Sequence, residues 1–304
     1  MKIGCGFLAA MMAEESVRAC ACGCGVFDVG TSSMLPSGQG GMAWVQYAFQ
    51  DQNRNWSGTS QAPAAGNDDK DIATSFVTVG VQYMISRSWG VQVEFPYDAR
   101  YFKTTDDSGN IVSRAWSGLG DLRVEGIYTG FSEDLSSGVV FGLKLPTGRF
   151  NYDADVVDRD SQLGSGSTDA LIGGFHRGHL SAEHQLDWFG QLLLDVPMFI
   201  QDGYRPGLEL DTALGLNYNG LWIGRVGIVP IAQVIFSERT SDSGPNSASP
   251  VASGYQRLML APGVEIHAHP FRFYADIELP VYQNFTGNQL AASILVKAGF
   301  SVMF

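Results

Sequence analysis

The chain has 304 residues, of which 45% are apolar and only 16% are charged, and its formal net charge is −12. Typical soluble domains contain roughly 25% charged residues, so the composition favours a protein with much of its surface against lipid. The acidic balance excludes nucleic acid as a partner, because phosphate contacts require clustered lysine and arginine. No run of about 18 uninterrupted apolar residues occurs, so the sequence predicts no transmembrane helix.

The N-terminus has the pattern of an export signal. Lys2 supplies a positive charge, residues 3–13 form an apolar run, and signal peptidase could cut after Ala19 or Ala21. We therefore expect residues 1–21 to be a signal peptide. Residues 22–41 should follow as a periplasmic segment rich in cysteine, glycine and serine.

Three cysteines, Cys20, Cys22 and Cys24, form a C-x-C-x-C pattern beside the predicted cleavage site. Thiolates bind soft metals such as Cu(I), so a metal site is one interpretation. A disulfide with a partner is another, since three thiols cannot all pair internally. Lipidation of Cys20, or no role at all, are the further alternatives, and apart from this possible metal the sequence predicts no cofactor.

From residue 42 onward, apolar and polar residues alternate along the chain with a period of two, which is typical of β-strands. Segments of helical period are absent, and no linker divides the chain. Twelve strands are predicted, at 42–52, 72–85, 89–103, 120–132, 138–150, 169–181, 186–201, 207–219, 221–237, 255–268, 272–284 and 290–304. The fold class is therefore all-β, and residues 42–304 form a transmembrane antiparallel up-and-down β-barrel of about 12 strands.

The last predicted strand, residues 290–304, alternates strictly and ends on Phe304. It resembles the terminal strand of bacterial outer-membrane barrels, in which a final phenylalanine belongs to the signal read by the barrel-insertion machinery. The resemblance implies that this machinery is a partner and that Phe304 carries the insertion signal. We expect the strand to close the barrel by pairing with residues 42–52.

The connections between the predicted strands alternate between long polar segments, such as 53–71 and 238–254, and tight turns, such as 86–88 and 269–271. Outer-membrane barrels have long loops outside the cell and short turns in the periplasm. We therefore expect the protein to lie in the bacterial outer membrane, in contact with its lipid, with both termini in the periplasm.

Strand parity separates apolar residues, which should face lipid, from charged residues, which should face the lumen. A charge on the lipid face would cost roughly 2–4 kcal/mol for Arg or Lys near the bilayer midplane. The predicted lumen-lining residues are Glu94, Asp98, Arg100, Arg123, Glu125, Lys144, Asp195, Glu209, Asp211, Arg225, Glu265, Asp276, Glu278 and Lys297. Because nine of these are acidic and five basic, we expect a passive channel for small solutes with a mild preference for cations. The alternative is a non-conducting structural or binding barrel whose cysteine segment engages a metal or a partner protein.

Three glycine-rich segments flank the fourth to sixth predicted strands, at residues 117–121 (SGLGD), 142–148 (GLKLPTG) and 164–169 (GSGSTD). With them the chain resembles the outer-membrane transporter family named for the meta-pathway of phenol degradation. The resemblance is good over the fourth to sixth strands and loose elsewhere. It implies a barrel channel for small solutes and does not identify the solute.

An enzyme is not expected. A twelve-stranded barrel phospholipase uses a histidine and a serine two residues later, and His179 and Ser181 have that spacing. The Asn-Gly that follows the serine in that family is missing here. Barrel proteases use Asp and His pairs at the extracellular rim, whereas the histidines of this chain fall at the predicted periplasmic ends.

Overall fold

A computed structural model describes residues 35–36, 38–181, 183–247 and 252–304, so the predicted signal peptide and the three clustered cysteines lie outside the described residues. Fourteen strands form one antiparallel sheet. They are β1 (Gly40–Gly58), β2 (Ser60–Gln61), β3 (Asp69–Met84), β4 (Trp89–Thr105), β5 (Ile111–Leu119), β6 (Leu122–Tyr128), β7 (Ser137–Leu145), β8 (Ser167–Ser181), β9 (Leu186–Ile200), β10 (Glu209–Tyr218), β11 (Leu221–Ile223), β12 (Val226–Arg239), β13 (Tyr255–Ala268) and β14 (Phe271–Met303). Two short 3₁₀ turns, η2 (Ala64–Gly66) and η3 (Arg159–Ser161), lie in the connections.

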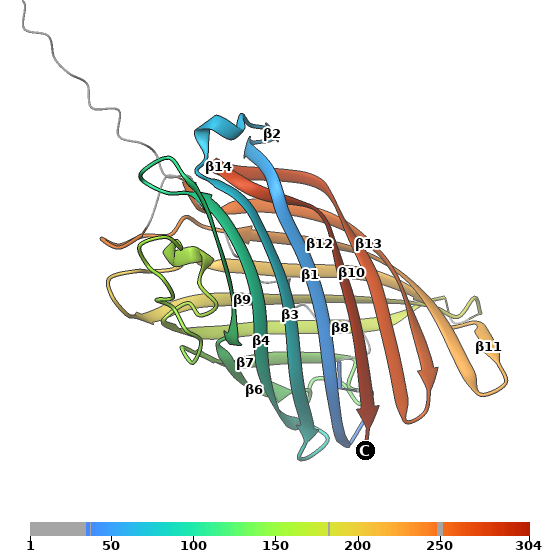
Figure 1. Ribbon diagram of the computed structural model, residues 1–304. Coiled ribbons are helices and arrows are strands. Elements are labelled where there is room, and N and C mark those ends of the chain that lie inside the picture. The colour runs from blue at the N-terminus through green and yellow to red at the C-terminus, as the bar shows by residue number, and fades with distance from the viewer. Residues whose placement is uncertain (1–34, 37, 182, 248–251) are drawn as a thin grey trace, which may run out of the picture.

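The sheet closes on itself as a barrel (Figure 1). Pairing of β10 with β12 completes the ring, so no barrel strand is left as a free edge of the wall. The predicted closing strand is confirmed, because β1 pairs with the end of β14 from Met42 opposite Met303 onward. Phe304 continues this ladder by exchanging two backbone hydrogen bonds with Gly41.

The ring contains eleven strands, and β2, β5 and β11 lie off it, so the predicted count of twelve is not confirmed. Much of the difference lies at β14, a single element of 33 residues. Its first half pairs with β13 and its second half pairs with β1. Figure 1 shows β14 bending back at the end of the barrel opposite the C-terminus.

The sequence patterns missed strand β5 and misplaced the turn that follows β10. Residues 111–119, expected to be loop, form β5 and pair with the second half of β4, while β6 pairs with the first half. The expected turn at Gly220 is a break between β10 and β11, and the chain reverses only at residues 224–225. The fold therefore extends two hairpins beyond their predicted ends.

Long and short connections separate to the two ends of the barrel. Residues 59–68 and 146–166 connect strands at one end, here called the loop end, whereas residues 85–88 and 269–270 connect strands at the other, here called the turn end. The C-terminus lies at the turn end (Figure 1). No helix among the described residues is long and apolar enough to cross a membrane.

The outer surface of the wall is apolar. On β14, Phe273, Ile277 and Leu279 are all more than 40% exposed, whereas the residues between them, Tyr274, Asp276 and Glu278, are buried inside. The same alternation runs through the other long strands, as the pleat of a β-sheet requires. Apolar side chains thus cover the outside, and the polar side chains of the strands face inward.

Candidate functional site

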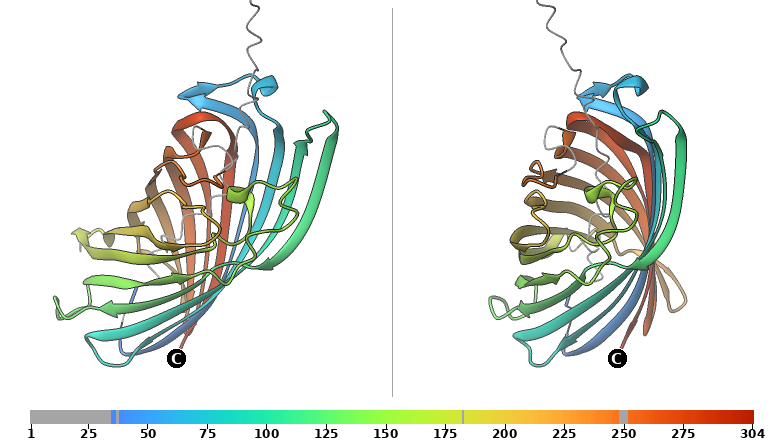
Figure 2. Two further views of the ribbon diagram at one scale, coloured as in Figure 1. Left: turned by 90° about the vertical axis from the view of Figure 1, so that its left-hand side faces the viewer. Right: turned by 60° about the vertical axis from the view of Figure 1, so that its left-hand side comes forward.

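The loop between β7 and β8, residues 146–166 and here called the inward loop, folds into the barrel. Figure 2 shows this yellow-green segment and its short turn η3 on the concave side of the sheet. Val157 of this loop packs with Ile72, Phe102 and Leu290 of the wall. Ser161 is fully buried although it belongs to a connection. The inward loop therefore narrows the loop end of the lumen.

Asp121 holds both ends of the inward loop. Its Oδ1 accepts a hydrogen bond of 2.9 Å from the Gly148 amide, and its Oδ2 accepts bonds of 2.7 and 2.5 Å from the amide and hydroxyl of Ser165. The two loop ends touch, since a Cβ on Gly164 would lie 2.4 Å from the carbonyl carbon of Gly148. Only residues without a side chain allow this approach. The three glycine-rich segments of the sequence thus meet at one point, the base of this loop.

Arg100 on β4 holds the middle of the inward loop. Its Nε donates to Thr74 Oγ1 at 3.0 Å, and its Nη1 donates to the carbonyl oxygens of Gln162, at 3.1 Å, and Ser161. Gln162 in turn bonds both backbone groups of Tyr152. A charged donor bonded to two carbonyl groups is a strong anchor. The inward loop is therefore attached to the wall as well as at its base.

Arg159 separates the lumen from a pocket outside it. Its guanidinium lies between the rings of Phe150 and Tyr204, 4.5 and 4.6 Å from their centroids, and donates to the Ser165 carbonyl at 2.7 Å. Arg159 and Gln162 line both an outer pocket and the interior cavity. These two side chains form the partition between the two spaces.

The interior cavity below the inward loop has a volume of about 180 Å³ and a charged lining. Five acidic and five basic side chains line it: Asp98, Asp121, Asp160, Asp195 and Glu209, with Arg100, Arg123, Lys144, Arg159 and Arg239. A second cavity of about 90 Å³ lies toward the turn end, where Leu35 and Pro36 reach the lumen. Gln46 and Thr78 line both cavities, so the two are neighbours.

Strand register places several of these charges side by side. Arg123 is opposite Glu94 on one side and Lys144 on the other, and Glu209 lies between Asp195 and Arg239. Lys144 Nζ is 2.6 Å from Asp169 Oδ2 and 2.5 Å from Asp195 Oδ2. The charges thus form a band across seven neighbouring strands, from β4 to β12.

The other side of the lumen contains clusters of apolar side chains beside its buried charges, which differs from the predicted polar lumen. One cluster contains Ala48, Ala213, Ile235, Met259, Ala261, Ala292 and Leu295, with Phe76 packed against it. A second contains Phe189, Val229, Ile231 and Tyr274. The first half of strand β12, residues 226–232, is apolar on both faces, so parity alone could not assign an inward polar side to it.

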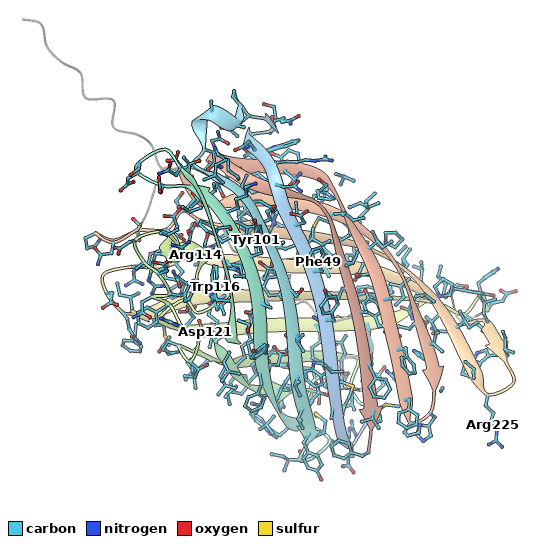
Figure 3. The ribbon with its side chains drawn as sticks, viewed as in Figure 1. Phe49, Tyr101, Arg114, Trp116, Asp121 and Arg225 are labelled. Atoms are coloured by element: carbon cyan, nitrogen blue, oxygen red, sulfur yellow. The ribbon has the colours of Figure 1, made fainter. Side chains whose placement is uncertain are left out.

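The predicted lumen residues fall into three places. Those that line the two interior cavities are Glu94, Asp98, Arg100, Arg123, Glu125, Lys144, Asp195 and Glu209, and Glu265 lines a separate pocket with His267 and Arg272. Five others, Asp211, Glu265, Asp276, Glu278 and Lys297, are buried on strands β10, β13 and β14, where Lys297 pairs with Glu278 at 3.1 Å. Arg225 does not line the lumen: it lies exposed in the turn between β11 and β12 and points away from the barrel (Figure 3).

Sequence reasoning missed the two residues that shape the constriction, Asp121 and Arg159. Asp121 belongs to the glycine-rich segment 117–121, but a glycine turn explains that segment equally well. Arg159 lies in the connection between β7 and β8, where no alternation of residues indicates which way a side chain points. His179 and Ser181 have different partners, Asp187 at 2.6 Å and His184 at 2.8 Å, and so do not act as one pair. Within the described ranges no group of three or more His, Cys, Asp or Glu residues could hold a metal ion.

Comparison with known proteins places the fold but not the family. No protein-family model matches the chain, and no curated protein matches it. An outer membrane channel from Pseudomonas putida F1 is similar in structure, with a TM-score of 0.63 and 12% identity over 91% of this chain and 100% of that one. The β domain of the Bordetella autotransporter BrkA is also similar, with a TM-score of 0.52 and 14% identity over 88% of this chain and 100% of that one. The chain therefore has the fold of outer-membrane β-barrels.

Proposed function

We propose that this protein is an outer-membrane channel through which small hydrophilic solutes diffuse passively. The observation that carries the proposal is the charged interior cavity beneath an inward loop that is anchored at its base and its middle. A barrel needed only as a membrane anchor gains nothing from a charged cavity, whereas a narrow pore uses such a lining to replace the hydration of a passing solute. The structural likeness to an outer membrane channel from Pseudomonas putida F1 supports the proposal through the fold.

The exposed apolar side chains on the outer surface of the wall, here called the apolar belt, support the location of the barrel in lipid. The long connections at one end and short turns at the other support an orientation with the loop end outside the cell and the turn end in the periplasm. In this orientation a solute meets the outer pocket first. It then passes the partition of Arg159 and Gln162 and enters the charged cavity.

The mild cation preference inferred from the sequence finds no support. The lining of the larger cavity contains five acidic and five basic side chains. Lys144 is paired with two carboxylates, so little uncompensated charge remains along this part of the path. We propose a channel that discriminates by solute size more than by charge.

A liposome-swelling experiment tests the proposed channel. Wild-type protein and a variant in which residues 151–162 are replaced by a short glycine linker would be reconstituted and challenged with solutes of increasing size. Asp121, Gly148 and Ser165 remain, so the base of the loop is retained. We expect slow uptake of small solutes by the wild type and several-fold faster uptake, extending to larger solutes, by the variant. No uptake through either protein would contradict the proposal and favour a non-conducting barrel.

Soft-metal binding at Cys20, Cys22 and Cys24 is a separate proposal about a segment outside the described residues. It predicts that a peptide spanning residues 20–30 binds Cu(I) in a fixed ratio, because thiolates are preferred ligands of that ion. A spectroscopic titration checks this, and the absence of binding removes the metal interpretation.

A further inference from the structure

The barrel carries a projecting hairpin at its turn end, formed by β11 and the first residues of β12. Ile223 pairs with Val226, Trp222 with Gly227 and Leu221 with Ile228. The neighbouring strand β9 already begins its pairing with β10 at Leu186 opposite Tyr218. The hairpin of residues 219–228, here called the tip hairpin, therefore extends past the wall on that side, as Figure 1 shows.

The tip hairpin exposes an unusual amount of apolar surface for so short a segment. Leu221, Trp222 and Ile223 are consecutive and are 44%, 59% and 71% exposed, and Val226 is 36% exposed. Burial of apolar surface is worth about 25 cal/mol per Å², so this tip would be costly to leave in water. Contiguous exposed apolar residues mark a contact with lipid or with another protein.

The exposed face of the tip hairpin continues the lipid-facing surface of the barrel. Alternation along β12 places Val226 and Ile228 on the same side as the exposed Val234. Cross-strand pairing adds Ile223 and Leu221 to that side. The apolar belt therefore extends without interruption from the wall onto the hairpin, which favours lipid over a protein partner as its neighbour.

The polar groups of the tip hairpin fit the border between acyl chains and headgroups. The Trp222 indole donates to the Asn219 carbonyl at 2.9 Å, and its ring lies over Gly227, on the face of the hairpin opposite to Leu221 and Ile223. Arg225 is exposed at the very tip, beside Gly224 with its φ of 63°. Tryptophan is enriched at membrane interfaces, and arginine extends its charge from apolar surroundings toward headgroups.

We propose that the tip hairpin is a membrane anchor. Its apolar face inserts into the boundary between headgroups and acyl chains of the leaflet at the turn end, and Arg225 binds lipid phosphate there. The anchor rests on the proposed location of the barrel in a lipid bilayer. It would fix the depth and tilt of the barrel on the side of β10 and β12.

Site-directed spin labelling tests the anchor in the full chain reconstituted into bilayers of phosphatidylethanolamine and phosphatidylglycerol. The native cysteines would be changed to serine, and one label attached through Ile223→Cys, Glu183→Cys or Leu279→Cys in turn. Glu183 lies exposed in another turn at the same end, and Leu279 lies on the apolar belt. We expect the ratio of oxygen to nickel-chelate accessibility at position 223 to be several-fold higher than at position 183 and close to that at position 279.

The outcomes separate the anchor from the channel proposal. A lipid-exposed label at 279 with a water-exposed label at 223 would overturn the anchor and leave the barrel in the bilayer. A label at 223 shielded from both reagents would also overturn it, because a protein partner would then cover the hairpin. Water exposure at both 223 and 279 would contradict the membrane location itself.

The role of Arg225 is tested by a charge reversal in the labelled protein. Arg225→Glu should move position 223 toward water and lower its accessibility ratio severalfold, because the carboxylate repels lipid phosphate. Arg87→Glu is the matched control, since Arg87 is an exposed arginine in the turn between β3 and β4 at the same end. An equal ratio in both variants would overturn the phosphate contact.

Discussion

The two sides of the barrel interior are built from the same alternating strands, but one side borders a cavity and the other is closely packed. The cavity side, formed by β3, β4 and β6 to β9, contains the charged cavity and the inward loop. The packed side, formed by β10, β12, β13, β14 and β1, contains the apolar cluster around Met259 and Leu295 and buried charges that pack beside it, such as Lys297 and Glu278. The two sides meet at Ala48 and Phe76, which border both, and at Glu209 of β10 and Arg239 of β12, which also line the cavity. The apolar residues on the outer face of a strand indicate that it belongs to the wall. The types of residue on its inner face decide whether the lumen beside it stays open.

The largest expected effect comes from replacing one lysine on each side of the interior, Lys297 on the packed side and Lys144 on the cavity side. Lys297 on the packed side is 3% exposed and pairs with Glu278, which is fully buried. Lys297→Met leaves that carboxylate uncompensated and should lower the free energy of unfolding by about 3–5 kcal/mol, measured by urea denaturation in lipid vesicles. The double variant with Glu278→Leu should recover much of the loss.

Lys144 on the cavity side should affect ion selectivity, which Lys297 should not. Lys144→Met leaves Asp169 and Asp195 without their cation, and the reversal potential in a salt gradient should shift toward cation preference. Lys297→Met should leave the reversal potential unchanged. If Lys297→Met also shifts the reversal potential, or if it alone does so, the proposed difference between the two sides is wrong.

Truncation of the packed side should cost stability without changing permeation. Leu295 is 1% exposed and belongs to the apolar cluster, whereas its neighbour Ile294 is 44% exposed on the outer surface. Leu295→Ala should reduce the free energy of unfolding by about 2–5 kcal/mol, and Ile294→Ala by much less because lipid refills the space. Liposome-swelling rates should be equal in the two variants. Faster swelling for Leu295→Ala would show that the packed side conducts.

Release of the inward loop should change permeation on the cavity side. Asp121→Ala removes the acceptor for the Gly148 amide and for the amide and hydroxyl of Ser165. Swelling with small solutes should become a few-fold faster, with little change in stability. Asp155→Ala, an exposed residue of the same loop, is the control and should behave as the wild type. Equal rates for all three proteins would show that the loop is not the barrier.

The smallest effect on stability concerns the turn between β4 and β5, which belongs to neither side of the interior. Asp106 Oδ1 accepts hydrogen bonds from the amides of Asn110 and Ser108, and the Asn110 bond chiefly lowers the pKa of Asp106 below 3.8. Because the folded pKa is lowered, this stabilisation is present above pH 3.8 and is lost as the pH falls through the folded value. The protection of the Asn110 amide from hydrogen exchange, relative to its intrinsic exchange rate at each pH, should therefore fall in acid. Asp106→Ala should remove the protection at every pH, because no acceptor remains, whereas Asp106→Asn should keep part of the protection but make it independent of pH.

Much of the barrel wall could be predicted because alternation is strong wherever one face meets lipid. The ends of β8, β9 and β13 lie within two residues of the predicted ones. The missed strand β5 contains serine and glycine among its alternating residues, and its pairing with β4 is a long-range contact that composition does not reveal. The break between β10 and β11 shifted the hairpin turn, which is why Arg225 was assigned to the lumen and lies at a tip.

The site was less predictable than the wall. Apart from Arg225, inward parity selects positions on the inner face of the barrel, but it cannot tell a cavity from a packed interior, because both are sheltered from lipid. Met259 and Leu295 fill the lumen only because strands distant in sequence bring them together. The direction of the inward loop depends on the bonds of Asp121 and Arg100 to its backbone, and no period marks such contacts.

Chemical labelling of the lumen tests the central claim most directly. In a chain with its native cysteines changed to serine, Thr78→Cys places a thiol where the two cavities meet, and Met259→Cys places one in the apolar cluster, where Met259 is fully buried. A small charged methanethiosulfonate reagent added to reconstituted protein should modify the thiol at position 78 and leave the thiol at position 259 intact. Modification at 259 with none at 78 would contradict the account.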